Sequence, residues 1–259
     1  MAPRPGGSET AVSRSPYRLK DDPYSSHSVI VSLLGQGRGR RLLDTGAADG
    51  FLAEVLSARG WTVTAVERDP VQAERARGKC QEVIAADLID VVPKLSDRFD
   101  AIVYGDVLEH LADPVTALRC VNQTLAPGGL VVISVPNVAH LWVRLSLLLG
   151  RFEYTERGIL DRTHLRFFTR RTFLELLTQA TLAVDALHVT PAPLPLVVPP
   201  RLHGAWLRAA HALSARAARL WPGGLAYQFV AACRLLPPAR DGAPDDRAPR
   251  PRPGPSSTR

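Results

Sequence analysis

Four acidic residues follow short apolar runs, and their positions favour binding of a positively charged ligand that carries hydroxyl groups. Asp44, Glu67, Asp87 and Asp106 each stand at the end of a predicted strand. The carboxyl ends of parallel strands meet at one edge of a sheet, where open α/β sheets bind their ligands. Carboxylates gathered there would accept hydrogen bonds from hydroxyl and amino groups and attract a cation, whereas they would repel a pyrophosphate.

A glycine-rich turn joins the first of these strands to the next helix. Residues 42–50 have the sequence L-L-D-T-G-A-A-D-G. Glycines at such a turn let a ligand approach the backbone closely, and we expect the amides of the turn to be free donors. The dinucleotide-binding pattern G-x-G-x-x-G fails because Ala48 replaces one glycine and Phe51 another. What remains is D-x-G-x-x-x-G, although a plain strand–turn–helix connection would also fit.

A histidine in a short predicted loop is the candidate for proton transfer. Residues 158–169 place Asp161 and His164 beside two arginines. Imidazole is the side chain best matched to removing a proton near neutral pH. We interpret His164 as the base or the acceptor-orienting group, with Asp161 fixing it. A structural ion-pair cluster of Asp161, Arg162 and Arg166, with His164 capping a helix, is the open alternative.

Strands and helices alternate through the first half of the chain. The hydrophobic pattern predicts strands at 41–44, 62–67, 82–86, 99–104, 130–135, 183–189 and 226–235, and helices at 51–59, 70–78, 114–125, 172–181 and 201–220. Five strand–helix alternations indicate a doubly wound α/β fold with a parallel sheet and helices on both faces. The alternation breaks at two insertions, 137–168 and 191–222. Residues 191–200 hold five prolines, so we expect no regular element there.

Several segments in this order resemble the class I S-adenosylmethionine-dependent methyltransferases, in particular the MetW-like, type 23 subfamily. They are the turn D-T-G-A-A-D-G, an acid 17 residues after its last glycine, A-A-D-L, F-D-A-I-V-Y-G-D-V-L-E-H, L-A-P-G-G and D-R-T-H-L-R-F-F-T. Ala48 departs from the family's usual middle glycine. The resemblance covers about residues 24–190. It implies a seven-stranded, mostly parallel Rossmann-like sheet whose last strand is antiparallel, with helical insertions after strand five and before the last strand.

The resemblance also implies S-adenosylmethionine as cofactor and assigns residues to it. Glu67 would bind the ribose hydroxyls and Asp87 the adenine amine. The segment containing Tyr24 and His27 lies over the cofactor in similar proteins, although Ser25 or Ser26 could equally be an ordinary helix cap. The implied cofactor-binding residues are Asp44, Gly46, Ala48, Gly50, Glu67, Arg68, Asp87, Leu88, Asp106 and Val107.

The segment after the fourth strand has two interpretations. Asp106, Glu109 and His110 resemble the E-x-x-E-H segment of the ubiquinone-type O-methyltransferases, which binds a divalent ion, and His164 would be a further ligand. In the other interpretation, which we favour, His110 packs under the sheet edge and Glu109 is an acid at a helix start. Metal dependence therefore stays open. The catalytic candidates are His164, His110 and Asp161.

The expected reaction is methylation of a hydroxyl group on a small molecule or a sugar-containing (glycan-type) intermediate. N-P-P-Y, typical of amide and adenine N-methyltransferases, is replaced by Y-G-D-V. A metal-assisted, ubiquinone-like O-methyltransferase is one alternative. A cofactor-binding module without catalytic activity is another. The apolar stretch 141–149 and the amphipathic stretch 201–219 leave contact with a membrane surface open, although core packing is the simpler interpretation.

Composition sets broad limits on the class of protein. The chain has 259 residues, is 46% hydrophobic and 22% charged, and has three cysteines in no metal-binding pattern. The net charge is +7, of which residues 1–20 contribute +3 and residues 237–259 contribute +2. We expect the two Pro- and Arg-rich tails, 1–15 and 237–259, to be disordered on either side of a domain at 16–236. The weakly charged body makes nucleic acid an unexpected partner. We expect a cytoplasmic protein, and the sequence leaves its oligomeric state open.

Overall fold

The computed structural model describes residues 22–92, 95 and 98–237. Seven strands form one sheet in the order β3-β2-β1-β4-β5-β7-β6. The predicted tails lie outside the described residues, apart from residue 237. The strands are β1 (Arg41–Thr45), β2 (Thr62–Glu67), β3 (Glu82–Ala85), β4 (Phe99–Gly105), β5 (Leu125–Pro136), β6 (Leu182–Thr190) and β7 (Gln228–Leu235).

The first five strands are parallel, and β7 lies antiparallel between β5 and β6. This confirms the predicted seven-stranded, mostly parallel sheet with an antiparallel last strand. The direction of winding reverses between β1 and β4, so the crevice at their carboxyl ends is the switch point where such sheets bind ligands.

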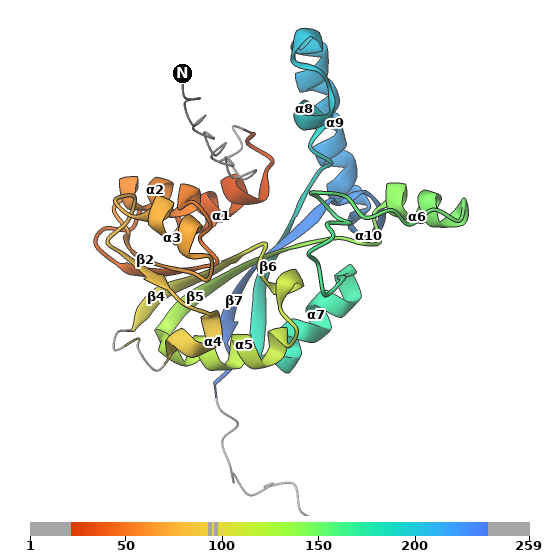
Figure 1. Cartoon of the computed structure of the whole chain (residues 1–259). Helices are drawn as coiled ribbons and strands as arrows, with labels where there is room; N and C mark the ends of the chain where they lie inside the picture. Colours follow the sequence, from red (N-terminus) through yellow and green to blue (C-terminus); the bar gives the residue numbers. More distant parts are fainter. Residues whose placement is uncertain (1–21, 93–94, 96–97, 238–259) are drawn as a thin grey trace, which may run out of the picture.

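Helices cover both faces of the sheet (Figure 1). One layer contains α1 (Ser26–Leu34), α2 (Phe51–Ala58) and α3 (Pro70–Ala76), and the other contains α4 (Leu88–Val91), α5 (Pro114–Val121) and α7 (Arg170–Gln179).

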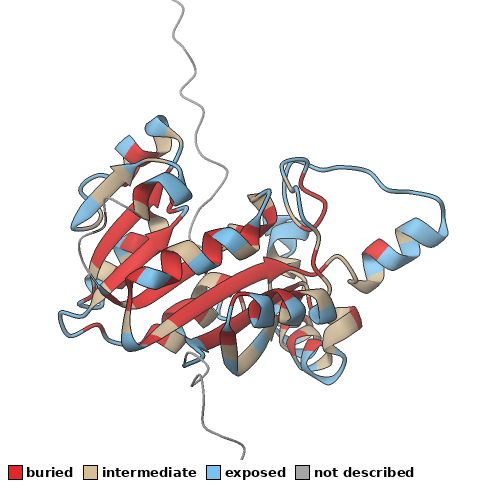
Figure 2. Ribbon diagram, turned by 90° about the horizontal axis from the view of Figure 1, so that it is seen from below, coloured by how far each residue is buried: buried red, intermediate tan, exposed pale blue. Residues whose placement is uncertain are grey.

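Neighbouring residues of the central strands pack into opposite cores, because side chains of a strand alternate between its two faces. Leu42 packs with Ile30 and Leu56 under the first layer, whereas Leu43 packs with Leu118 and Val121 under the second. Burial on both faces explains why these strands are continuous apolar runs. Figure 2 shows the buried strands between helices whose outer faces are exposed.

The predicted helix starts are confirmed where aspartate precedes proline. The Asp69 carboxylate accepts hydrogen bonds from the backbone of Val71 and Gln72, and Asp113 caps α5 by accepting from the Thr116 amide. Proline fits the first helical position because no intrahelical donor is needed there.

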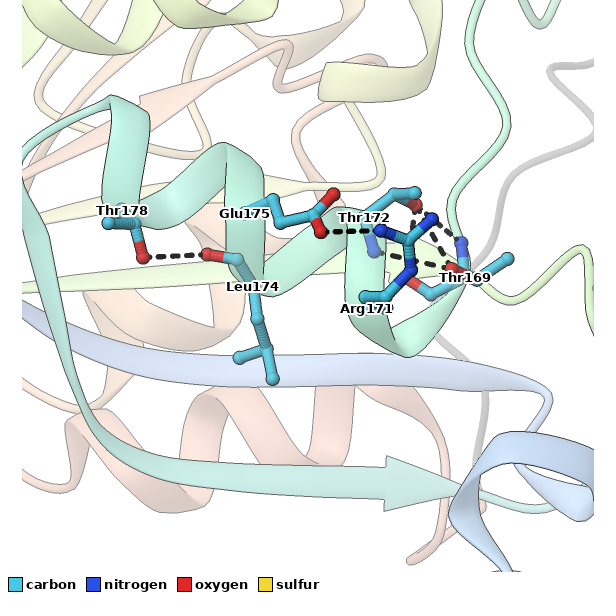
Figure 3. Close-up of polar contacts among 6 residues, drawn as sticks. All are labelled: Thr169, Arg171, Thr172, Leu174, Glu175 and Thr178. Atoms are coloured by element: carbon cyan, nitrogen blue, oxygen red, sulfur yellow. Dashed lines mark hydrogen bonds and ion pairs between the residues drawn. The ribbon is translucent and has the colours of Figure 1, made fainter.

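Helix α7 begins two residues earlier than predicted. The Thr169 hydroxyl accepts from the Thr172 amide at 3.2 Å, and the Thr172 hydroxyl accepts from the Thr169 amide at 2.9 Å (Figure 3). This reciprocal capping box fixes the start at Arg170. The helix ends at Gln179, before Thr181 takes a φ of +57°.

Two boundaries around β5 differ from the prediction. Helix α5 ends at Val121 rather than at residue 125, and a short 3-10 turn, η3 (Asn122–Thr124), follows it. Strand β5 begins at Leu125, so the expected P-G-G turn lies within it as a bulge, where the register against β4 shifts between Phe99 and Ala101. A bulge places extra residues of one strand opposite fewer residues of its partner, so residues 126–129 of β5 lie opposite the single residue 100 of β4.

The two insertions carry helices of their own. The first contains α6 (Leu141–Leu148). The second contains α8 (Leu194–Val197), η4 (Pro200–Leu202), α9 (Ala205–Leu220) and α10 (Pro222–Leu225). The expectation of no regular element in 191–200 was wrong, because Pro193 stands at the N-cap of α8 and Pro195 lies in its first turn, where proline is tolerated.

Both α6 and the pair α8–α9 extend away from the sheet (Figure 1). Across the described part of the chain, no helix has the length and apolar character needed to cross a bilayer.

Candidate active site

The glycine turn after β1 has left-handed backbone at three positions, which costs little at the two glycines and is strained only at Ala48. Gly46 and Gly50 have φ values of +68° and +77°, and Ala48 also has a positive φ, of +48°. Gly46 is exposed, and a Cβ atom added to it would lie 2.7 Å from Cγ2 of Val107. A side chain at this position would therefore clash with the loop that follows β4, which together with the positive φ explains why this position needs glycine.

The expectation of free amides in this turn was wrong. The amides of Gly46 and Ala47 donate to the Val66 carbonyl at 2.8 and 3.0 Å, and the Ala48 amide donates to the Glu67 carboxylate. These bonds fasten the turn to β2. The turn thus offers an open backbone surface, while its conformation is held by the neighbouring strand.

Glu67 is a buried, positioned carboxylate at the end of β2. Its side chain is 8% exposed, and it accepts from the Ala48 amide at 2.8 Å and from the Asp69 amide at 2.9 Å, one oxygen to each. A solvated loop acid would make neither bond. Each carboxylate oxygen can accept a second hydrogen bond, so the pair is suited to two adjacent hydroxyl groups. The following residue, Arg68, is exposed.

Asp44 carries an unsatisfied atom beside the same turn. Its side chain is 2% exposed, and its Oδ2 has no hydrogen-bond partner among the described residues. Burial, followed by the negative charge of Glu67, raises the pKa of Asp44 from 3.8 to about 7. A buried carboxylate without a partner is unfavourable, so this position favours a ligand that brings a positive charge.

The third strand end contributes a more exposed acid. Asp87 caps α4 by accepting from the Ile89 amide at 3.1 Å, and Leu88 is buried behind it. The cap uses one carboxylate oxygen. Contact between Asp87 and an adenine amine stays a prediction.

Asp106 links four elements at the switch point. It has a φ of +57°, and its carboxylate accepts from the Ser134 hydroxyl at 2.5 Å, from Gln228 Nε2 at 2.9 Å and from the Ser26 hydroxyl at 3.5 Å. Left-handed backbone is uncommon outside glycine and clusters at functional sites. Strands β4, β5 and β7 and helix α1 therefore converge on one carboxylate.

The N-terminal segment is an ordinary helix start. Ser25 caps α1 by accepting from the Ser28 amide, as the structural alternative proposed. Helix α1 starts at Ser26, so His27 lies within the helix rather than before it. The Tyr24 ring meets the His211 ring at 5.2 Å. A role for Tyr24 or His27 over the cofactor stays a prediction.

The first insertion brings a second set of candidate residues against the end of β4. The rings of His110 and His164 meet edge to face at 4.9 Å. Glu109, in the 3-10 turn η2 (Leu108–His110), is 1% exposed, and its carbonyl accepts from the Leu165 and Arg166 amides. Glu109 is thus an acid in the first turn of a short helix, as the favoured interpretation has it, and it is buried against the inserted loop.

His164 is held in the form a base needs. Its Nδ1 lies 3.1 Å from the carbonyl of Ile159, which can only accept, so Nδ1 carries the proton and Nε2 keeps its lone pair. Burial, followed by the charge of His110, lowers the pKa of His164, which favours the neutral ring. The expected partner, Asp161, bonds elsewhere: its Oδ1 accepts from the amide and hydroxyl of Thr163.

The alternative of an ion-pair cluster around Asp161 does not match the observed contacts. Arg162 pairs with Glu156 at 2.8 Å, and Arg166 donates to the carbonyl of Ala112. The Thr163 hydroxyl instead joins Asp161 to Nδ1 of His110, at 2.7 and 3.2 Å. Asp161 therefore holds Thr163, through which the inserted loop that carries His164 contacts His110.

Several of these residues were missed in the sequence. Ser134 and Gln228 hold Asp106, Thr163 links Asp161 to His110, and Ile159 orients His164. Ser134 is a polar residue within an apolar strand, which was a usable signal. The Ile159 contact uses a backbone carbonyl, which no side-chain pattern can reveal.

Comparison with known proteins identifies the family. A family model described as a methyltransferase domain matches residues 22–187, which is more than half of the chain. The chain belongs to this methyltransferase family. A methyltransferase structure from Archaeoglobus fulgidus, described as S-adenosylmethionine-dependent, superposes with a TM-score of 0.55 over 80% of this chain and 93% of that one, at 16% identity, and shows that the fold is shared.

Curated relatives of this methyltransferase match a part of their length. The ubiquinone biosynthesis O-methyltransferase of Alkalilimnicola ehrlichii is 35% identical over 42% of this chain and 46% of its own length. The protein of the same description from Caulobacter sp. is 32% identical over 50% of this chain and 55% of its own length. The chain thus spans about half the length of the curated relatives it matches.

Proposed function

We propose that the protein transfers a methyl group from S-adenosylmethionine to a hydroxyl group of a small molecule. The observation that carries this proposal is the pairing of two sites at the switch point. One site consists of Asp44 and Glu67, the acids at the ends of β1 and β2. The other consists of His164, a neutral histidine held against the end of β4. The O-methyltransferase relatives support the reaction type.

The residues at the rim fit the cofactor. Glu67 offers two acceptors to the ribose hydroxyls, and the unsatisfied oxygen of Asp44 suits the positively charged end of the ligand. Gly46 leaves room for close approach beside Val107. S-adenosylmethionine, when bound, would supply an activated methyl group on a sulfonium sulfur. Asp87 would complete the site at the adenine amine.

The inserted loop performs the remaining tasks. Nε2 of His164 would accept the proton of the acceptor hydroxyl as the hydroxyl oxygen takes the methyl group, for which S-adenosylmethionine would supply a thioether leaving group. Phe167 contacts the His164 ring, and Phe152 contacts Phe167, both at 6.1 Å between ring centroids. These aromatic side chains suit contact with either a planar ring or the apolar face of a sugar. The proposed acceptors therefore include sugar-containing molecules.

His164→Ala should lower turnover by about 100-fold or more, because general base catalysis typically contributes 10²–10⁴-fold. Affinity for S-adenosylmethionine should stay unchanged, since His164 lies on the acceptor side. The measurements are methyl transfer to pools of small hydroxylated acceptors and titration calorimetry. His203→Ala, an exposed histidine of the second insertion, is the matched control.

Normal turnover in His164→Ala would contradict its role as base. Tight cofactor binding by the unaltered chain without transfer to any acceptor would favour a non-catalytic, cofactor-binding module instead.

A metal-assisted reaction is the second candidate function, and one observation favours it. Side-chain atoms of Glu109, His110 and His164 lie within 4.8 Å of one another, close enough to bind one ion. Glu109 is buried with Oε2 unsatisfied within the part of the chain that the structure describes. Burial, followed by the charges of Asp106 and Asp161, raises its pKa well above the usual value, which a bound cation would reverse.

A chelator separates the two candidates. If a metal assists, dialysis against a chelator should abolish transfer, and Mn²⁺, Zn²⁺ or Mg²⁺ should restore it. Calorimetric titration with these ions should show binding to the unaltered chain and none to His110→Ala. Full activity after chelation, together with no ion binding, would contradict the metal-assisted reaction and favour general base catalysis by His164 without a metal.

A further inference from the structure

Helix α9 carries two apolar faces, and only one of them packs against the body. The inner face is buried and consists of Leu207, His211, Ala215 and Ala218. Three residues at intervals of seven, Trp206, Leu213 and Leu220, are 57%, 64% and 87% exposed. Seven residues make almost two turns, so these three form one stripe, on the side of the helix opposite the inner face. We call them the outer stripe.

The inner face is fixed in place, so the outer stripe cannot turn inward without breaking a buried contact. Nε2 of His211 lies 3.0 Å from Oδ2 of Asp22, in the segment before α1, and both side chains are largely buried. Leu207 and Ala218 are 4% and 0% exposed. The outer stripe therefore faces away from the body as a consequence of the fold.

The outer stripe belongs to a larger apolar projection. We call residues 194–221 the arm; Figure 1 shows its helices α8 and α9 extending beyond the sheet. The arm exposes four further large apolar side chains, those of Leu196, Val197, Leu202 and Trp221. A soluble body rarely leaves so many such residues together on one projection unless they meet a partner.

The charge of the arm has a single sign. All its charged residues are arginines, and all four are exposed: Arg201, Arg208, Arg216 and Arg219. The sequence contains no aspartate or glutamate between residues 186 and 240. Apolar side chains, two tryptophans and basic residues without acids are the combination that lies at the surface of an anionic bilayer.

Other partners fit these features less well. In a symmetric dimer the same surface meets itself, which would bring arginines against arginines with no acid to pair them. Nucleic acid would use the arginines but would leave Leu213 and Leu220 without a contact. We propose that the arm docks on an anionic lipid surface, with α9 parallel to it and the outer stripe inserted among the lipids.

Vesicle flotation of the full chain tests this proposal. The protein should float with vesicles of equal parts phosphatidylglycerol and phosphatidylcholine, and much less with phosphatidylcholine alone. Trp206→Ser/Leu213→Ser/Leu220→Ser should weaken binding by about tenfold or more, because it removes the inserted apolar groups. Tryptophan emission should shift to shorter wavelength on binding, and Trp206→Leu should bind while losing most of that shift.

Charge variants provide a matched control. Arg208→Glu/Arg216→Glu should weaken binding and its dependence on salt. Arg77→Glu/Arg171→Glu changes the net charge equally, at the C-terminal end of α3 and on α7, and should bind normally. If the triple variant melts at a lower temperature than the unaltered chain, Leu213→Glu alone replaces it, and this single variant should also weaken binding.

Three results would overturn the proposal. These are no flotation of the unaltered chain, equal binding to neutral vesicles, and equal loss in the α3/α7 control. Sedimentation equilibrium tests whether a second copy of the chain binds the arm instead. A dimer that the outer-stripe variant abolishes, in a chain that does not bind vesicles, would identify the arm as an interface between two copies.

Discussion

Glu67→Ala should weaken binding of S-adenosylmethionine by about 1–3 kcal/mol in total, or roughly 5- to 150-fold, because the ribose hydroxyls lose their hydrogen bonds to a charged acceptor. The buried carboxylate has spare acceptor capacity on both oxygens and is held rigid by two backbone amides. Titration calorimetry measures the affinity. Glu82→Ala, an exposed acid at the start of β3, should bind normally.

A double-mutant cycle separates direct contact from loss of support to the turn, since Glu67 also holds the Ala48 amide. The 2′-deoxy analogue of S-adenosylhomocysteine should bind the unaltered chain more weakly than its parent. In Glu67→Ala, the 2′-deoxy analogue should bind almost as well as its parent, because the carboxylate that accepts from the hydroxyl is already absent. Equal effects of the missing hydroxyl in both proteins would contradict the ribose contact.

Asp44→Asn should move stability and cofactor affinity in opposite directions. At pH 8 the free energy of unfolding should rise by about 1–4 kcal/mol, because a buried, partnerless charge is removed. Affinity for S-adenosylmethionine should fall by about tenfold, because the positive end of the ligand loses its counter-charge. Denaturant unfolding and titration calorimetry measure the two effects.

The stabilising effect of Asp44→Asn should depend on pH. The pKa of Asp44 is about 7 in the folded chain and 3.8 as its ordinary value, so the folded chain binds this proton more tightly than the unfolded chain. The Asp44 contribution to the free energy of unfolding therefore decreases as pH rises from about 4 to 7 and stays low above that. The variant should lose its advantage towards pH 5. A constant difference between pH 5 and pH 8 would contradict the buried ionisation.

Much of the cofactor half of the site could be predicted, because its geometry follows from local patterns. An apolar run followed by an acid predicts both a buried parallel strand and a carboxylate at its end. Asp69 and Asp113, each before a proline, fix two helix starts for the same local reason. Parallel topology then brings the strand ends to one rim.

The acceptor half could not be predicted to the same depth. Gln228 meets Asp106 across 122 residues of sequence, and Ile159 orients His164 through its backbone. Contacts of this kind depend on which segments, distant in the sequence, the fold brings together, and no periodic pattern encodes that. The short helix α8 was missed because five prolines suggested an irregular segment, although one of them is its N-cap and another lies in its first turn.

A crystal structure of the full chain with S-adenosylhomocysteine is the most direct test of the central claim that the carboxylates of β1 and β2 bind the cofactor. The account predicts the ribose hydroxyls within hydrogen-bond distance of the Glu67 carboxylate and the amino end of the ligand near Asp44. A ligand bound elsewhere, or a Glu67 side chain turned away from the ribose, would contradict it.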